Sequence, residues 1–347
     1  MKKLPFYEKV NSTYPHNAHS MAILYPHIEF HEWIKNCFIQ IEGWDMENMD
    51  YEDFWMLECP LIRYQRISKK IIELKWKTII DFIVEMLDNE QYVYLLIKTD
   101  AIEQYENFNG EVHDALIYGY DEKKEKFLVA DFFKNGKYST CSIPYKIMET
   151  ATQNFTESQE RHWIFTADII LLEVPKREQP HFSLMRFKES IECYLEGKPT
   201  REWYHRSQRC YVRYPYRLLY GMDTYKILYH YVEMIQKDGI LLPHWRQVYH
   251  LWYEHKCNMC NRIKYVEETY GLFIIEKYSD RYYTIMKKTE ITLMLLIKYN
   301  ITHDGKIADI VKKYIDEVRV EEREILESIV QKLFNIVEDR RGRIDWG

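Results

Sequence analysis

The feature that most constrains the fold is a change of hydrophobic period along the chain. Between residues 91 and 174, short apolar runs alternate with turn-prone residues such as Asn135-Gly136, which is typical of antiparallel strands. After residue 181, apolar residues recur at helical spacing almost to the end. Between these regions lies "PKREQPH", residues 175–181, with the prolines and charges of a linker. One chain therefore holds two different architectures.

We predict an α+β domain over residues 1–175 and an all-α domain over residues 180–347. Residues 28–44 are expected to form short strands or turns. In the first domain we expect helices at about 18–24, 66–88 and 144–152, and antiparallel strands at 91–98, 113–120, 127–133, 137–143 and 163–174. In the second we expect helices at 182–195, 223–237, 244–270, 288–299 and 305–337.

Composition excludes several classes of protein. The net charge of −6 and pI near 6.1 argue against nucleic-acid binding. The chain lacks an apolar run of about 18 residues, so we expect no membrane span. Its N-terminus does not resemble a secretory signal. Seven scattered cysteines suit a reducing cytoplasm, and thirty tyrosines and nine tryptophans hint at a roomy amphipathic pocket.

The strongest sign of chemistry is "VHDALIYGYDEKKEKFLVADFF", residues 112–133. His113 opens one expected strand and Asp131 lies near the end of the next. The far ends of such a hairpin lie side by side, so the two side chains would come within hydrogen-bond reach. A carboxylate beside an imidazole fixes its tautomer and stabilises the imidazolium formed in catalysis. A structural histidine at a strand end is the alternative.

A second signal is "NAHSMAIL", residues 17–24, where polar residues precede an expected helix. A His–Asp pair needs a nucleophile, and a thiol at a helix N-terminus has a lowered pKa. The order of these segments resembles papain-like and C39-peptidase-like folds. Those folds place a cysteine at the start of the first long helix and the His and Asp/Asn later, on the sheet. Ala18 stands where that cysteine would be.

More narrowly, the chain resembles the butirosin biosynthesis protein H family. The segments "YGMDTYKILYHYVE" (220–233) and "WRQVYHLWYEHKCNMCNRIKYVEE" (245–268) are similar to that family's helical regions. The resemblance implies a papain-like domain joined to a helical domain. It also implies acyl transfer from a carrier-protein thioester to a small amine, with amide formation in antibiotic, nonribosomal-peptide or polyketide-type biosynthesis.

On that resemblance, a cysteine at position 18 would attack the thioester, His113 would act as base and then acid, and Asp131 would orient it. No bound cofactor is implied beyond the phosphopantetheine arm of the acyl or peptidyl carrier protein. Three explanations of Ala18 stay open: the alanine is an introduced substitution, the protein is a naturally inactive relative, or another cysteine is the nucleophile. Cys37 and Cys59 are the candidates for the last, although a buried apolar cysteine is usually inert.

Other residues are candidates for binding. The backbone N–H of residue 18 is a natural oxyanion donor, with Asn11 or Asn17 supplying a second from a side chain, although both asparagines also suit turns or caps. His19 would lie at the mouth of the cleft, and Tyr118, on the His113 strand, is expected to line it. Glu254 and Arg262 are expected either to form buried polar contacts or to line the acceptor side.

Two further patterns carry predictions. Cys257 and Cys260 form a single CxxC inside an expected helix, with His250 and Glu254 on one face, which is weak support for zinc; we expect no metal. The segment "REWYHRSQRCYVRYPYR", residues 201–217, places Arg206, Arg209 and Arg213 on one face if helical. This face suits docking of an acidic carrier protein, with a solvated surface as the alternative.

Acyl transfer is therefore the expected function, and the Ala18 chain is expected to turn over little substrate. A thioesterase or amidase would use the same residues with water as acceptor. A catalytically inactive carrier- or peptide-binding protein is the contrasting class. A homodimer is possible, and the acyl group and the amine stay undetermined.

Overall fold

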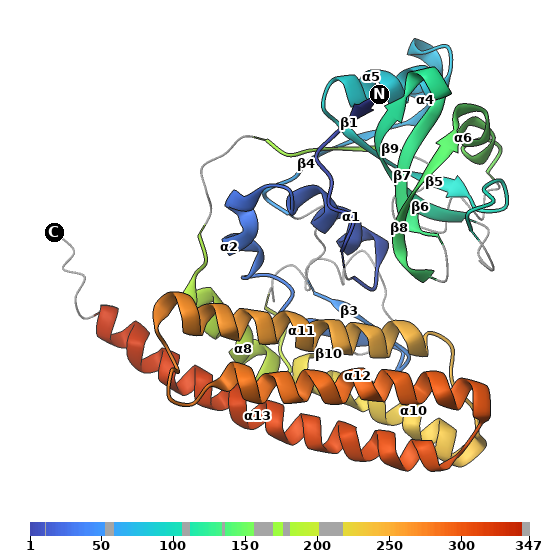
Figure 1. Ribbon diagram of the computed structural model, residues 1–347. Coiled ribbons are helices and arrows are strands. Elements are labelled where there is room, and N and C mark those ends of the chain that lie inside the picture. The colour runs from blue at the N-terminus through green and yellow to red at the C-terminus, as the bar shows by residue number, and fades with distance from the viewer. Residues whose placement is uncertain are drawn as a thin grey trace. The chain divides into compact units, whose positions relative to one another are not determined.

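The structure, a computed structural model (Figure 1), divides the chain into two compact units. Unit 1 comprises Met1–His31 and Phe54–Gln179, and unit 2 comprises Glu32–Asp53 and Pro180–Gly347. The structure describes residues 1–10, 12–52, 59–105, 112–133, 136–155, 169–175, 181–200 and 218–341, with side chains up to residue 335. The mixed α+β class, with antiparallel sheets and a helical C-terminal region, is as predicted.

Unit 1 is built on one antiparallel sheet. Its strands are, in sheet order, β4 (Arg63–Ile67), β9 (Ile169–Glu173), β5 (Tyr92–Lys98), β6 (Val112–Asp121), β7 (Lys126–Phe132) and β8 (Tyr138–Pro144). The short β1 (Lys2–Lys3) pairs with β6 beyond the end of β5. Buried aliphatic side chains fill the central strands β5 and β6, which explains their nearly continuous apolar sequences.

The helices of unit 1 pack around this sheet. They are α1 (Pro15–Leu24), α4 (Lys69–Lys75), α5 (Ile79–Asp88) and α6 (Tyr145–Ala151), with 3-10 turns η1 (Ile28–Phe30) and η2 (Glu122–Lys124). The single helix predicted over 66–88 is wrong. Its start is the end of strand β4, and Trp76 is extended. Thr78 then begins α5 through a capping box with Asp81, which supplies a new helix start inside the apolar period.

Unit 2 is mainly helical. Its helices are α8 (Leu184–Glu196), α10 (Tyr225–Asp238), α11 (Trp245–Tyr270), α12 (Tyr278–Thr302) and α13 (Lys306–Arg341), with η4 (Gly221–Thr224). Along the chain, α2 (His31–Ile34) lies where unit 1 passes into unit 2. A small sheet joins β10 (Leu219–Tyr220), β2 (Ile41–Trp44) and β3 (Asn48–Tyr51).

The assignment of residues 32–53 to unit 2 corrects the predicted boundary, which placed them in the first domain. Strand β2 pairs with β10, at Leu219 opposite Gly43. The α11 side chains hold the same segment by its backbone: His255 Nε2 lies 2.8 Å from the Ile39 carbonyl, and Arg262 donates to the carbonyls of Lys35 and Cys37. The α11 contacts join positions more than 200 residues apart, so no local pattern reveals them.

A buried polar cluster occupies the core of unit 2. Lys256 on α11 and Glu322 on α13 are fully buried, and the Lys256 Nζ lies 2.7 Å from Glu322 Oε1. The Glu322 carboxylate also accepts hydrogen bonds from the hydroxyls of Tyr194, Tyr225 and Tyr282. We call these five residues the Lys256 cluster. It ties α8, α10, α11, α12 and α13 together.

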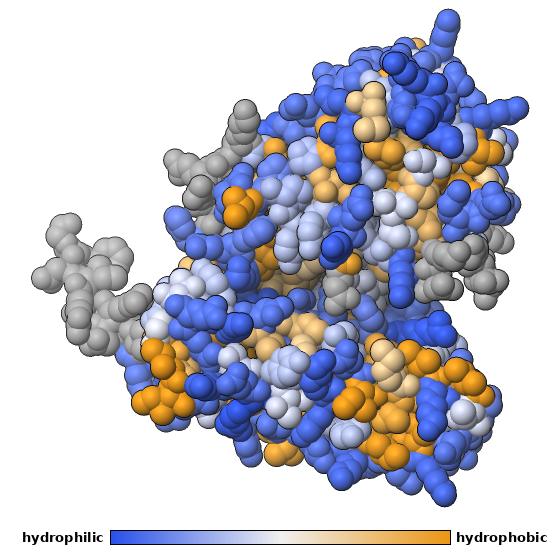
Figure 2. All heavy atoms as spheres, in the orientation of Figure 1, coloured by the Kyte–Doolittle hydropathy of each residue, from blue (hydrophilic) through white to orange (hydrophobic). Residues whose placement is uncertain are grey.

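The surface of unit 2 carries patches of apolar residues, which Figure 2 shows in orange. The exposed large hydrophobic side chains of α12 include Tyr283, Ile291, Met294 and Ile301. Within the part of the chain that the structure describes, no helix is long and apolar enough to cross a membrane.

Candidate functional site

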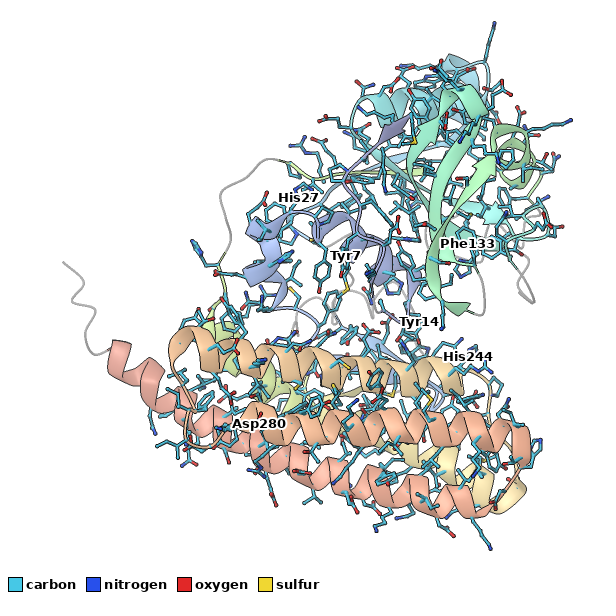
Figure 3. All side chains as sticks on the ribbon, viewed as in Figure 1. Tyr7, Tyr14, His27, Phe133, His244 and Asp280 are labelled. Carbon is cyan, nitrogen blue, oxygen red and sulfur yellow. The ribbon has the colours of Figure 1, made fainter. Side chains whose placement is uncertain are left out.

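The first element of the site is helix α1, shown in blue in Figure 1. Pro15 occupies its first turn, and Tyr14 before it is extended, as a residue preceding proline prefers. The helix ends at Leu24, shortly before Pro26, as predicted. Helix α1 contacts β6 and β7, the strands that carry His113 and Asp131. Figure 3 labels Tyr14 at the start of α1 and Phe133 just after β7.

The predicted pairing of His113 with Asp131 is confirmed. The His113 Nδ1 lies 2.7 Å from Asp131 Oδ2, and the side chain of His113 is 16% exposed while that of Asp131 is completely buried. Because a carboxylate accepts, Nδ1 carries the proton in the neutral ring, and Nε2 then holds the lone pair available for proton transfer. We call His113 and Asp131 the dyad.

An irregularity in the hairpin brings the two residues to one face of the sheet. Near the turn, Gly119 lies opposite Leu128, but farther along Leu116 lies opposite Ala130, so the register shifts by one residue at Tyr118. A one-residue slip exchanges the two faces of a strand. Without it, Asp131 would fall opposite Leu116 and point to the face away from His113. The bulge therefore creates the dyad.

The close approach of β1 explains why a glycine occupies position 119 at this bulge. A Cβ at this position would lie 2.5 Å from the carbonyl oxygen of Lys2 on β1, closer than any real side chain allows. The glycine thus lets β1 pair with β6 immediately after the bulge.

Asp131 is held by three donors. In addition to His113, the hydroxyl of Tyr105 donates to Oδ2, and the Phe132 backbone N–H donates to Oδ1 at 2.7 Å. Burial and the neighbouring Asp131 charge raise the pKa of Tyr105 well above its ordinary range, so this hydroxyl keeps its proton. Tyr105 lies between the strands predicted over 91–98 and 113–120, outside any predicted element. No local signal marked it.

The dyad favours the charged form of His113. Burial lowers the pKa of this imidazole, but the charge and hydrogen bond of Asp131 outweigh it, with a smaller contribution from Asp114, and raise the pKa to about 9. His113 is therefore an imidazolium at neutral pH. That state suits partnership with a thiolate, whereas a base acting on water or a hydroxyl needs the neutral ring.

His19 on α1 behaves in the opposite way. It is fully buried, and burial lowers its pKa to about 4, so it is neutral at pH 7. Its Nε2 lies 3.5 Å from the Asp114 carbonyl oxygen, and its Nδ1 lies 2.9 Å from the Tyr138 hydroxyl. His19 therefore anchors α1 to strands β6 and β8. The structure places it in the packing beneath the dyad region rather than at a cleft mouth.

A second carboxylate lies next to the dyad. Asp114 is 2% exposed, its Oδ2 accepts a hydrogen bond from the Tyr94 hydroxyl, and its Oδ1 lies 3.9 Å from His113 Nδ1. Two buried carboxylates thus surround one imidazole, and each takes a tyrosine hydroxyl.

Position 18 lies in α1 as predicted, but its backbone N–H is not free. The N–H of Ala18 donates to the Tyr14 carbonyl at 2.9 Å as part of the helix, so the predicted oxyanion donor is wrong in this structure. Pro15 starts the helix earlier than expected, which puts residue 18 inside the first turn. Ala18 and Asn17 are both buried.

The described cysteines do not supply a nucleophile. Cys37 belongs to unit 2 and is buried, as is Cys59. Cys141 on β8 is close enough to Asp131 for their charges to interact, but burial, followed by that charge, raises its pKa to about 12. The Cys141 thiol is therefore held in its unreactive form.

The remaining candidates have other placements. Tyr118 is buried at the bulge, stacks on Phe6 with ring centroids 4.0 Å apart, and is hydrogen-bonded to Thr140. Glu254 and Arg262 are buried in unit 2, and Arg262 makes the backbone contacts described above. Four predicted residues lie outside the described ones: Asn11, Arg206, Arg209 and Arg213.

The CxxC residues lie on α11. Burial raises the pKa of Cys260 to about 11 and also raises that of Cys257. Among the side chains that the structure describes, no group of three or more His, Cys, Asp or Glu residues is arranged to hold a metal ion.

No protein-family model matches this chain, and a search of curated proteins found no match. Function therefore has to be argued from the site.

Proposed function

We propose that unit 1 is a papain-like scaffold for amide-forming acyl transfer, with position 18 as the place of the nucleophile. The observation that carries the proposal is the dyad: an imidazolium held at 2.7 Å by a buried carboxylate, on two strands that α1 contacts. The chain order of helix, histidine and aspartate is that of the resemblance noted above. Ala18 stops the covalent step in the present chain.

The proposed reaction needs a cysteine at position 18. Its thiolate, paired with the His113 imidazolium, attacks the carbonyl carbon of a carrier-protein thioester. The carbon–sulfur bond to the pantetheine arm breaks, and His113 gives its proton to the departing thiolate, which leaves as the free thiol. An amine then attacks the acyl-cysteine and loses its proton to His113. The amide leaves and the thiolate–imidazolium pair is restored.

The raised pKa of His113 favours a thiol mechanism in particular. With a pKa of about 9, roughly one His113 in a hundred is neutral at pH 7. A serine or water nucleophile would have to work with that small fraction. A cysteine gains from the same charge, because an adjacent imidazolium lowers the thiol pKa.

Residue 18 itself favours a second candidate, a non-catalytic protein that binds a carrier or peptide. Its methyl group is fully buried in a helix of ten buried residues, a packing that needs no thiol. In that case the natural residue is alanine, and the dyad contributes charge to binding only. Under either candidate, Ala18 chains do not form an acyl-enzyme.

The test is the substitution Ala18→Cys, with Ala18→Cys/His113→Asn as its matched control. We expect iodoacetamide to alkylate the introduced thiol about 100-fold faster at pH 6.5 in the single variant than in the control, because the control lacks the imidazolium that lowers the thiol pKa. Peptide mapping by mass spectrometry assigns the label to position 18. Equal rates in the two variants contradict any action of His113 on that position.

Acyl transfer is tested on the same variants with acetyl- and hexanoyl-pantetheine thioesters. Intact-protein mass spectrometry should show an acyl gain on the Ala18→Cys chain, absent from the Ala18 chain. Clearance of the adduct by 1,3-diaminopropane supports aminolysis, and equal clearance without amine supports a thioesterase instead. A folded Ala18→Cys chain that is rapidly alkylated at position 18 but gains no acyl group overturns the acyl-transfer proposal and leaves the binding protein ahead.

A further inference from the structure

We propose that Tyr105 is a positioning residue that sets the charge balance of the dyad. Its hydroxyl shares Oδ2 of Asp131 with the His113 imidazole, and it thereby limits how strongly the carboxylate holds the imidazole proton. The catalytic importance of this role rests on the proposed function. The electrostatic effect itself does not.

The geometry points to more than packing. Both Tyr105 and His113 donate to Oδ2, while the Phe132 backbone N–H donates to Oδ1 at 2.7 Å. An aromatic ring without a hydroxyl would fill the same space, because the Tyr105 ring already packs on Phe133 with centroids 4.8 Å apart. The hydroxyl is therefore the part of Tyr105 that acts on the dyad.

The sign of the effect follows from the direction of the dipole. The Tyr105 O–H places its positive end on Oδ2, where it neutralises part of the carboxylate charge that His113 experiences. Removing the hydroxyl restores the part of the Oδ2 charge that Tyr105 had neutralised, and His113 then experiences it. The proton on His113 should then be held more tightly. Tyr105 is 7% exposed, so water does not replace the lost donor easily.

The backbone also fixes the position of Tyr105. It follows β5 in a turn closed by its N–H, which donates to the Ile102 carbonyl at 3.1 Å. Its ring centroid lies 6.2 Å from that of His113. A shift of this turn would change the hydrogen bond to Asp131 and with it the charge state of the dyad.

Several other ionisable groups influence His113 and enter the test. Asp131 on β7 and Asp114 on β6 are the carboxylates, and both act on its pKa. Further groups around them are His16 and His19 on α1, Tyr94 on β5, and Tyr138 and Cys141 on β8. Burial raises the pKa of Tyr94, Tyr138 and Cys141 and lowers that of His19, so these four stay neutral near pH 7.

The experiment is an NMR titration of the His113 imidazole in the full Ala18 chain, with its resonance assigned by its loss in His113→Asn. We expect Tyr105→Phe to move the titration midpoint upward by about one pH unit, as loss of one charged hydrogen bond implies. A purely structural role would loosen Asp131 and move the midpoint downward. An unchanged or lowered midpoint therefore overturns the proposal.

Two matched variants calibrate the shift. Tyr94→Phe removes the hydroxyl on Asp114, whose Oδ1 lies 3.9 Å from His113 Nδ1, and should move the midpoint by less than half as much. Tyr120→Phe removes a hydroxyl that donates to Asp88 at 2.8 Å at the other end of β6, and should leave the midpoint unchanged. Equal shifts in all three variants would mean a general effect on the sheet and would refute the assignment.

A second variant, for which the expected shift of the His113 midpoint is downward, keeps the proposal testable if Tyr105→Phe misfolds. Replacing Tyr105 by 3,5-difluorotyrosine makes the hydroxyl a stronger donor, so the His113 midpoint should fall. A rise or no change counts against the proposal. Because these readouts need neither a thiol at position 18 nor a thioester, they stand if acyl transfer fails, and acyl transfer stands if they fail.

Discussion

The dyad of unit 1 and the Lys256 cluster of unit 2 are built from the same chemistry. In each, a fully buried carboxylate accepts hydrogen bonds from tyrosine hydroxyls and from a cation. Glu322 takes three tyrosines and Lys256, whereas Asp131 takes Tyr105, a backbone N–H and His113. Their difference lies in the cation.

Lys256 is closed off, and His113 is not. The Lys256 Nζ has no exposed surface and is surrounded by Glu322, the Tyr194 hydroxyl and His255 Nδ1. His113 keeps 16% of its side chain exposed at the start of a strand and carries a second ring nitrogen for proton transfer. A saturated ion pair specifies how helices pack, while a partly open one can exchange protons. The Lys256 ammonium is thus closed to solvent, whereas the His113 imidazole is partly open to it.

The largest expected effect is a difference in stability between variants of the Lys256 cluster and variants of the dyad. Glu322→Gln leaves the Lys256 ammonium buried without its counter-charge, so we expect a loss of about 3–5 kcal/mol in the free energy of unfolding. Asp131→Asn should cost clearly less, because His113 can release its proton and stay hydrogen-bonded. Urea unfolding followed by circular dichroism measures both. Equal losses in the free energy of unfolding would show that the two buried carboxylates contribute alike to stability.

A control for this test removes both charges. Lys256→Met with Glu322→Leu should recover most of the loss of Glu322→Gln, because no unpaired ion then remains in the core. Failure of the double variant to recover would show that the tyrosine hydroxyls, rather than the ion pair, dominate the cluster.

The next effect is the pH dependence of stability that His113 and His19 of unit 1 produce. His113 has a folded-state pKa of about 9, above its ordinary 6.5, so its stabilisation is complete below pH 6.5 and is lost as the pH rises through 9. The loss amounts to about 3 kcal/mol at most. His19, with a folded pKa of about 4, removes stability as the pH falls from 6.5 to 4. Thermal unfolding between pH 4 and 10 should show an acid limb and an alkaline limb, in which the melting temperature falls towards low and towards high pH.

Single variants assign those limbs. His113→Asn should flatten the loss of stability at alkaline pH and leave the loss at acid pH. His19→Asn should reduce the acid loss without abolishing it, because burial also lowers the pKa of His255 in unit 2. If the alkaline limb persists in His113→Asn, the stabilising proton lies elsewhere, and the charged state assigned to the dyad is wrong.

The smallest expected effect concerns Cys141. Its thiol interacts with the Asp131 charge, but its pKa is raised to about 12, so adding Cys141→Ala to the Ala18→Cys chain should change the alkylation rate at position 18 by less than about twofold. Peptide mapping after iodoacetamide should show little label on Cys141 in the Ala18 chain. Preferential labelling of Cys141 would revive it as the nucleophile that position 18 lacks.

Much of the fold was predictable because it depends on local patterns. The strands from 91 to 143 alternate with clear turn signals, and β5 to β8 lie where those signals place them. The helix over 66–88 failed because its apolar period continues across Thr78, where a capping box starts a new helix. The placement of residues 32–53 failed because the contacts that decide it, from His255 and Arg262, are distant in sequence.

The candidate site divides in the same way. A histidine and an aspartate at the far ends of a hairpin sufficed to predict that the two residues lie near each other, because antiparallel pairing is set by the turn. The bulge then decides that both side chains lie on one face of the sheet. The charge on His113 could not be predicted from the sequence. It depends on burial, on Asp114 and on Tyr105 from the turn after β5. The role of the Ala18 N–H was mispredicted because the helix begins at Pro15 rather than at residue 18.

The two architectures, and the position of His113 and Asp131 at the same end of one hairpin, follow from the amino-acid sequence, because apolar period and turn residues act over a few positions. The face of the sheet that Asp131 occupies follows from contacts between distant parts of the chain. That choice depends on the bulge at Tyr118, where Gly119 admits the backbone of β1 and the register slips by one residue. Side chains alternate between faces with a period of two, so one extra residue moves a carboxylate from the wrong side of the sheet to the imidazole.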